Sequence, residues 1–369
     1  MRSLRFILAI AIAACLAAAC GPTEPLKVGF ISGQTGPFSD LGLSGLNGAI
    51  LAVEARNEKG GINGRPVRLV IRDDEHSGAR AKAVFNDLVK EGALAVVGPM
   101  TSAIATELAP EANARQVVLM GGTVVTNKLN GKNDFFFRAI GSTAYYAAYS
   151  ARIHARELQA QRITVVFDAA NRDYAENWAK DYAAEMERIN AQKVDIIEID
   201  SRAPQELPAY LQRITRHAPD LITFACSAKT AAGLMRSLRA RNKEVRFATS
   251  AWAANRVLLE NVGEAGDGAL VEQYHDLDDR SDTYRQFAES FRKRFGPPPD
   301  YAAVVAYDAT SIVLDALERH PHRDGLKAAL LQTPTYNGLQ TRITLDANGD
   351  AARPAFTTLI KGGRFVALN

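Results

Sequence analysis

The sequence contains few cysteines, and their positions limit how the protein can be stabilised. Of three cysteines among 369 residues, Cys15 and Cys20 lie near the amino terminus and Cys226 is alone in the body of the chain. If the first two are lost to a leader and to lipid attachment, as argued below, no pair remains for a disulfide bond. We therefore expect an exported protein that is stabilised by its core and not by cross-links.

Neither sign of charge is in large excess. The 44 basic and 41 acidic side chains give a net charge of +3, and losing Arg2 and Arg5 with a leader leaves +1. The basic segment "RSLRAR" (236–241) contains no aromatic residues and is typical of a solvated helix end. This balance predicts neither nucleic acid nor an anionic membrane surface as a partner.

The sequence also lacks a hydrophobic run of membrane-spanning length. The longest run, from Phe6 to Ala19, has about 14 residues where a spanning helix needs about 20, and Arg2 and Arg5 precede it. This layout is typical of a secretory signal, so residues 1–19 are interpreted as a signal peptide. The remaining chain is expected to be soluble and to contact the membrane through a lipid anchor only.

The signal ends in "LAAACG" (16–21), which looks like a bacterial lipoprotein box with Cys20 as the lipid-attachment residue. Two alternatives stay open: Cys15 in "IAAC" as the attachment site, and an ordinary signal peptide with a chance cysteine. With Cys20 acylated, residues 20–25 form a short tether. The protein is then expected on the periplasmic side of the cell envelope, or on the cell surface of a host with a single membrane.

Motifs of catalysis are missing as well. The loop "SGQTGPFSDLG" after the first expected strand lacks G-x-G-x-x-G, no P-loop occurs, and Ser44 does not complete G-x-S-x-G. The histidines show no ligand spacing, and Asp73 and Asp74 of "RDDEH" (72–76) are expected to face the rim between the lobes or to cap neighbouring backbone, in preference to binding a metal. We expect no catalytic residue, no metal and no cofactor, and a periplasmic enzyme is the least favoured function.

What is present is a regular alternation of short apolar strands and amphipathic helices. The first series runs from "KVGFIS" (27–32) to "QVVLMGG" (116–122), and includes a helix with Leu43, Leu46, Ile50 and Val53 on one face. A second series runs from "RITVVFD" (162–168) to "EVRFATS" (244–250), and the tail from Tyr336 is typical of antiparallel strands around "DANGD". Nearly continuous apolar strands indicate parallel sheets covered on both faces. The fold class predicted is α/β, with two Rossmann-like lobes in series.

Six segments carry a resemblance to a known family. They are "GPFSDLG" (36–42), "NEKGGINGRPVRLVIRDDE" (57–75), "VVGPMTS" (96–102), "NRDYAEN" (171–177), "AYDATSIVLDAL" (306–317) and "DANGDAARPAFTTLIKGGRF" (346–365). In this order they resemble the type I periplasmic solute-binding proteins, specifically the leucine/isoleucine/valine-binding family that serves ABC transporters.

The resemblance implies two lobes joined by three crossing segments, near 138–142, 271–275 and 345–349. Lobe 1 would combine residues 26–141 and 274–346, and lobe 2 residues 142–273 and 347–369. A small molecule would be held in the cleft between the lobes.

The carboxyl edge of the first sheet offers an anion site. "GPMTS" ends a strand and opens a helix at Ser102, whose free N–H groups and dipole favour a carboxylate. The resemblance assigns the ligand's carboxylate to Ser102, although Thr101 or Ser102 could simply cap its own helix. It also points to Thr123 or Thr126 in "GGTVVTN" and to Tyr174, which could instead pack on its own helix.

The sequence departs from the family where the ligand's ammonium is bound. The loop after "EVRFATS" reads "SAWAAN", with Ala251 and Trp252 where an acid is expected, and Ser227 and Leu41 stand in place of tyrosines. Either Glu272 or Asp168 supplies the acid, or the ligand has no ammonium, since an unpaired buried charge costs several kcal/mol. Trp252 would then form an aromatic wall for a hydrophobic carboxylate or an amide, unless it is a core residue of lobe 2.

The function predicted is that of the substrate-binding lipoprotein of an ABC importer. It would bind an amino acid or related small carboxylate by hinge closure, at a site that includes Ser102, Thr123, Thr126, Tyr174, Ser227 and Trp252, and present it to a permease. The alternative is a periplasmic receptor that senses an amide or aromatic acid and acts through a signalling partner.

Overall fold

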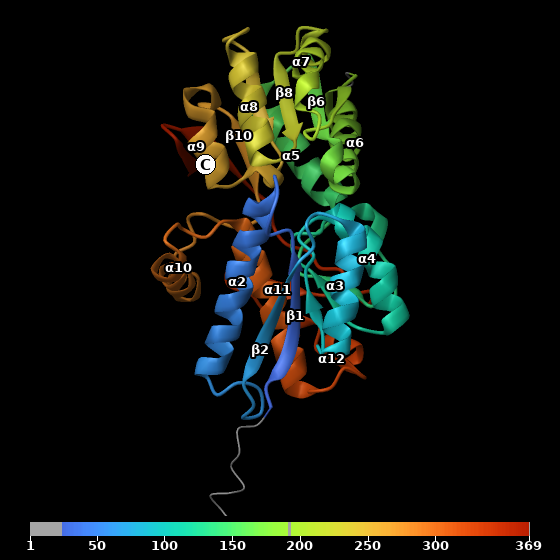
Figure 1. Ribbon diagram of the computed structural model, residues 1–369. Coiled ribbons are helices and arrows are strands. Elements are labelled where there is room, and N and C mark those ends of the chain that lie inside the picture. Colours follow the sequence, from blue (N-terminus) through green and yellow to red (C-terminus); the bar gives the residue numbers. More distant parts are fainter. Residues whose placement is uncertain (1–23, 191–192, 369) are drawn as a thin grey trace, which may run out of the picture.

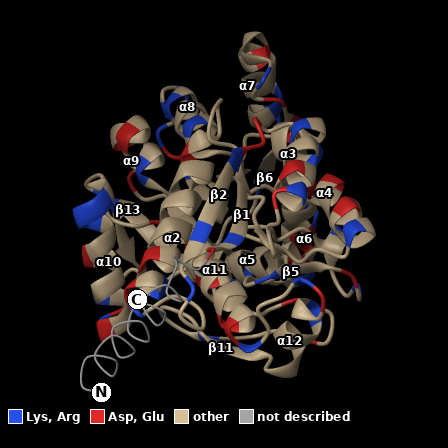
Figure 2. Cartoon of the chain, turned by 60° about the horizontal axis from the view of Figure 1, so that its bottom comes forward, with Lys and Arg blue, Asp and Glu red and all other residues tan. Residues whose placement is uncertain are grey.

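The computed structural model describes residues 24–190 and 193–368, which form two α/β lobes stacked end to end (Figure 1). The leader, Cys15 and Cys20 lie outside the described residues. Within those ranges, no helix combines the length and hydrophobicity that a bilayer-spanning segment needs. Figure 2 shows acidic and basic residues interspersed along the outer helices.

The lower lobe in Figure 1 is built on a parallel sheet of five strands. In sheet order these are β2 (Val67–Asp73), β1 (Leu26–Ser32), β3 (Val96–Val97), β4 (Leu119–Gly121) and β5 (Phe136–Arg138). Alternate strand residues enter different cores, so that Phe30 packs with α2 (Ser39–Glu58) and Ile31 with α3 (Gly78–Lys90) and α4 (Ser102–Arg115). The sheet is therefore covered on both faces, as its apolar strands predicted.

Segments far apart in the sequence complete this lobe. α11 (Tyr301–Arg319) packs along α2, and a Cβ built on Gly48 would lie 2.1 Å from the carbonyl oxygen of Ala303, so only glycine permits this approach. The chain around α11 contributes further elements. They are α10 (Asp282–Phe295), α12 (Leu326–Gln332) and the hairpin of β11 (Thr335–Asn337) and β12 (Arg342–Thr344).

The upper lobe contains a mixed sheet of seven strands. Its order is β14 (Arg364–Ala367), β13 (Phe356–Lys361), β10 (Leu270–Gln273), β9 (Arg246–Thr249), β8 (Leu221–Ala225), β6 (Ile163–Asp168) and β7 (Asp195–Ile199). The helices of this part are α5 (Thr143–Leu158), α6 (Arg172–Asn190), α7 (Leu207–Thr215), α8 (Ala228–Arg239) and α9 (Arg256–Val262). The α/β class and the parallel strands expected from the sequence are confirmed.

Two local expectations need correction. Leu43 of α2 is 43% exposed, because the buried face of this helix is formed by residues such as Leu46, Ala49 and Val53. The turn "DANGD" is flanked only by the isolated bridge between Leu345 and Ala351, whereas β13 pairs antiparallel with β10 and β14. The tail is antiparallel as predicted, but it extends the sheet of the upper lobe.

Candidate binding site

Side chains from both lobes meet around a small cavity, which we call the cleft cavity. It is lined by Leu41, Met100, Ser102, Thr123, Asn171, Tyr174, Trp252, Tyr274 and Tyr301. Its volume is about 10 Å³, close to the space of a single water molecule. A metabolite can therefore bind here only if the lobes or these side chains move apart.

Four of the six ligand-binding residues expected from the sequence line this cavity: Ser102, Thr123, Tyr174 and Trp252. Ser102 follows β3 and opens α4, and its Oγ accepts a hydrogen bond from the backbone N–H of Val125 at 3.3 Å. The Thr123 hydroxyl donates to the carbonyl oxygen of Met100. Both hydroxyls thus lie at the carboxyl edge of the sheet, where parallel strands deliver binding loops.

Thr126 and Ser227 lie elsewhere. The Thr126 hydroxyl accepts from the N–H of Lys128 at 3.2 Å and caps the short helix η1 (Asn127–Leu129). The Ser227 hydroxyl accepts from the N–H of Thr230 at 3.3 Å and caps α8. Neither residue lines the cleft cavity. The Thr126 hydroxyl also donates to Oδ1 of Asn177 in the other lobe at 3.3 Å. We therefore leave both out of the candidate site.

The amino terminus of α4 is not capped by its own side chains, although the sequence left that alternative open. Thr101 is the N-cap residue and its hydroxyl makes no capping hydrogen bond. The N–H of Ala103 instead donates to Oδ1 of Asn171 at 3.1 Å, across the gap between the lobes. A ligand carboxylate would compete for this N–H, since helix amino termini bind anions.

Sequence reasoning did not single out Asn171. It lies in the short helix η2 (Ala169–Asn171) directly after β6, and its side chain is buried. A polar residue at the carboxyl end of a parallel strand is the signal that could have found it.

Aromatic rings form the remaining wall of the cleft cavity. Trp252 is 4% exposed, and its ring centroid lies 5.4 Å from that of Phe38 in the other lobe and 5.9 Å from that of Tyr174. Tyr274 and Tyr301, which the sequence did not single out, meet edge to face at 5.4 Å. Trp252 therefore packs as a core residue and lines the cavity at the same time. Such a wall is suited to an apolar ligand body.

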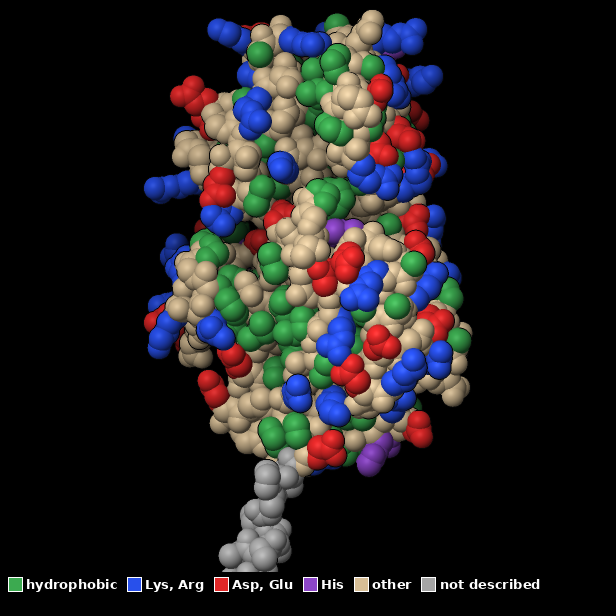
Figure 3. Space-filling view, viewed as in Figure 1, with side chains coloured by type: hydrophobic (Ala, Val, Ile, Leu, Met, Phe, Trp, Pro, Cys, Tyr) green, Lys and Arg blue, Asp and Glu red, His purple; other side chains and the backbone are tan. Residues whose placement is uncertain are grey.

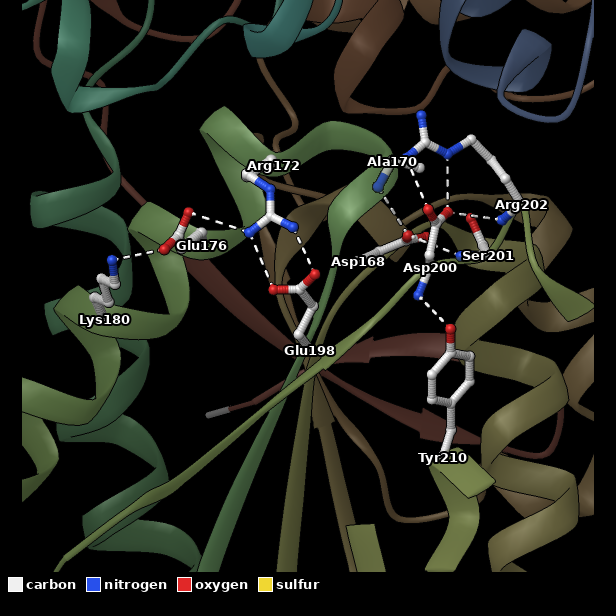
Figure 4. Close-up of polar contacts among 10 residues, drawn as sticks. All are labelled: Asp168, Ala170, Arg172, Glu176, Lys180, Glu198, Asp200, Ser201, Arg202 and Tyr210. Carbon is white, nitrogen blue, oxygen red and sulfur yellow. Dashed lines mark hydrogen bonds and ion pairs between the residues drawn. The ribbon is translucent and has the colours of Figure 1, made fainter. Parts of the chain in front are cut away.

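No carboxylate lines the cleft cavity among the described residues. Asp168, one of the two acids considered, caps η2 and accepts from the N–H groups of Ala170 at 3.0 Å and Ser201 at 3.1 Å. Figure 4 shows it beside the Asp200–Arg202 pair. Its carboxylate is thus used to order this edge of the upper lobe.

The other acid, Glu272 of β10, is buried behind the aromatic wall. Its carboxylate accepts from the N–H of Ala251 at 3.0 Å, the Ser150 hydroxyl at 3.1 Å and the Trp178 indole at 3.2 Å. Burial raises the pKa of Glu272 to about 7, because loss of hydration outweighs these donors. Through Ala251 it positions the turn that carries Trp252.

We expect Glu272→Gln to make folding stability less dependent on pH. The unfolded chain releases this proton near pH 4.5 and the folded chain near 7, so the folded state binds more protons between these values. The free energy of unfolding of the wild type therefore falls by about 3 kcal/mol as the pH rises from 5 to 8. The variant lacks this contribution, because glutamine does not titrate. Urea unfolding of both proteins at each pH measures the difference, and equal slopes would contradict the placement of a titrating carboxyl here.

Comparison with known proteins agrees with this geometry. The family model described as "Periplasmic binding protein" matches residues 25–364. The leucine-, isoleucine-, valine-, threonine-, and alanine-binding protein of Pseudomonas aeruginosa is 22% identical, over 90% of this chain and 89% of that relative.

Two solved structures share the fold. A leucine binding protein (LivK) from Thermotoga maritima has a TM-score of 0.86 at 23% identity, covering 93% of this chain and 98% of that one. A solute binding protein of an ABC transporter from R. palustris, solved with benzoate, has a TM-score of 0.81 at 20% identity, covering 94% and 96%. A family model that spans nearly all of the described chain, together with the cleft between its lobes, shows that this protein belongs to the periplasmic binding protein family, a family of solute-binding proteins found outside the cytoplasm.

Proposed function

We propose that the protein is the substrate-binding component of an ABC importer and captures a small carboxylate without changing it chemically. The observation that carries the proposal is the cleft cavity itself, where the amino terminus of α4, bound by Asn171 of the other lobe, lies beside a wall of aromatic rings. The family relatives are binding proteins, which supports capture over catalysis. A permease in the inner membrane is the partner, and lipid on Cys20 is the proposed anchor.

Capture works by closure of the two lobes, with the boundaries 26–141 plus 274–346 and 142–273 plus 347–369. Two contacts across the gap support this motion: Ala103 with Asn171, and Asn255, whose amide donates to Asp40 at 2.7 Å. A ligand that binds between the lobes stabilises the closed arrangement by as much as its affinity for the closed form exceeds its affinity for the open form.

The charges around the cleft cavity favour a carboxylic acid over an α-amino acid. An ammonium group in this cavity would meet rings and hydroxyls but no carboxylate among the described residues, and Glu272 already accepts three hydrogen bonds. Burial of an unpaired ammonium is costly, whereas an apolar body gains from contact with Trp252 and Tyr174. The structure with benzoate shows that the same fold accommodates such an acid in another protein.

Calorimetric titration with matched pairs tests this proposal. The pairs are leucine with 4-methylpentanoate and phenylalanine with 3-phenylpropanoate, with benzoate and leucinamide added. We expect the acids without an ammonium group to bind at least as tightly as the parent amino acids. Binding restricted to the amino acids would contradict the ligand class, and conversion of any bound compound would contradict the role as a binding protein.

Ser102→Ala is expected to lower the affinity for the tightest-binding acid of this panel about tenfold. The change removes one hydrogen bond to a charged group, worth about 1.5 kcal/mol. Ser227→Ala is the matched control, because it also removes a serine hydroxyl from the start of a helix but outside the cavity. Equal affinities of the Ser102→Ala protein and the wild type would show that the anion site lies elsewhere.

A further inference from the structure

A second and larger cavity lies on the outer side of the junction between the lobes. This hinge-side cavity has a volume of about 400 Å³, in the range of small-molecule sites, and shares no lining residue with the cleft cavity. It is formed by the start of α2, the turn into α9, the segment after β10, α10, and the Pro297–Pro299 segment before α11. Figure 3 shows hydrophobic side chains gathered over the space between α2 and α10.

The apolar part of the lining is substantial. Leu43 lies at its exposed rim, while Tyr284 and Phe291 of α10 are buried within it. Val257 and Leu259 contribute from α9. The exposure of Leu43, which the sequence pattern did not predict, is therefore exposure at the edge of this cavity.

Two polar side chains in the lining have buried atoms that make no hydrogen bond. His275 is 2% exposed and neither ring nitrogen makes a hydrogen bond. Gln273 is fully buried, and its Oε1 makes none, although its Nε2 donates to Thr358 at 3.3 Å. Buried polar atoms are nearly always paired, so both residues are suited to a ligand that brings its own polar group.

Two carboxylates face the same space. Asp300 accepts from the Ser44 hydroxyl at 2.5 Å and caps α11, and Asp40 accepts from Asn255 at 2.7 Å. Neither forms an ion pair with a basic residue in the described chain. Burial raises the pKa of Asp300 to about 6, and the charge of Asp40 adds to this effect. A cation between them would relieve their repulsion.

Unlike these two carboxylates, the basic residues that line the cavity are exposed to solvent. Arg256 is exposed and paired with Glu260, and Arg292 is exposed on α10. Among the described residues that line the cavity, hydrogen-bond acceptors lie on the buried side and the two cations are exposed. The buried Arg353 also acts on His275, but its charge is paired with Asp308 outside the lining.

We propose that the hinge-side cavity is a second ligand site, which binds a small ammonium compound with an apolar body. The ammonium group donates to Asp300, Asp40 and Gln273, and the apolar body lies against Phe291 and Leu43. The neutral His275 ring is an alternative acceptor for one of these three N–H groups.

Titration of the full chain with phenethylamine tests the proposal, with 2-phenylethanol as a probe of nearly the same shape that lacks the charge. We expect saturable binding of the amine with a Kd of about 1 mM or tighter and at least tenfold weaker binding of the alcohol. Asp300→Asn, which keeps a helix cap but removes the charge, is expected to weaken the amine at least tenfold.

Steric variants show where the probe binds. Ala288→Trp on α10 and Leu43→Trp on α2 each fill the hinge-side cavity from its rim, and both should abolish binding, while Ser102→Ala in the cleft should leave it unchanged. Two blocking variants are used so that a folding defect in one does not decide the result. The proposal is overturned if binding of the amine is not saturable or if the alcohol binds equally well. It is also overturned if the Ala288→Trp and Leu43→Trp proteins both still bind the amine.

Discussion

Replacing Arg353 by methionine is expected to lower the free energy of unfolding by about 3–5 kcal/mol. Arg353 and Asp308 form an ion pair at 2.7 Å, and both side chains are only 1% exposed. The substitution leaves a buried carboxylate without its cation, which costs far more than loss of a surface pair. Urea unfolding measures the change.

The same arginine connects the segments that run between the lobes. Its Nε donates to the carbonyl oxygen of Tyr274 at 2.9 Å, and its own carbonyl accepts from the Tyr146 hydroxyl at 3.2 Å. That hydroxyl also accepts from the N–H of Gly141 at 3.0 Å. Residues near all three crossing segments expected from the sequence are thus linked in one hydrogen-bonded chain, so the loss is expected to be cooperative.

Two controls separate charge burial from other effects. The double variant Arg353→Met/Asp308→Leu removes both charges and should recover most of the lost stability. Arg172→Met breaks the exposed pair with Glu198 shown in Figure 4 and should cost about 1 kcal/mol or less. A similar small loss for Arg353→Met would mean that the buried pair does not form.

Trp252→Ala is expected to lower the affinity for the tightest-binding acid of the panel about 100-fold, which corresponds to a loss of about 3 kcal/mol of binding free energy. The indole contacts Phe38 in one lobe and Tyr174 in the other, so its removal takes away both a wall of the cleft cavity and a contact between the lobes. Trp252→Phe keeps part of the wall and should restore part of the affinity. Calorimetric titration gives the values.

Phe247→Ala is the matched control for this prediction. Phe247 is a buried aromatic of β9 that packs on Phe224, away from the cleft cavity. Both alanine variants should be destabilised by several kcal/mol, because each removes a large buried ring. Only Trp252→Ala should lose affinity. Equal losses of affinity in the two would show that Trp252 acts through stability alone.

Local sequence pattern was enough to predict the elements and one part of the site. The order of strands and helices follows from short-range periodicity, so the α/β class could be read directly. Ser102 was predictable because a buried strand, a sharp turn and a helix start occur within "VVGPMTS", and these are all local features. The missing acid at Ala251 and Trp252 was likewise visible as a departure from the family.

The contacts across the lobes were decided by tertiary structure. Asn171, Tyr274 and Tyr301 come from separate segments and meet only because the crossing segments bring the lobes together. Thr126 and Ser227 had suitable chemistry and position in the chain, yet each caps the helix that follows it and lies outside the cleft cavity. The pairing of Arg353 with Asp308 and the burial of Glu272 are also long-range results.

The amino-acid sequence by itself therefore determined the alternating elements, the export signal as an expectation, and the helix start at Ser102. Only the tertiary structure decided which side chains share a cavity, which carboxylates are buried, and that Leu43 lies at the rim of a second cavity. The physical reason is that periodicity and turn chemistry act over a few residues. Burial and side-chain pairing depend on residues that the fold brings together from distant parts of the chain.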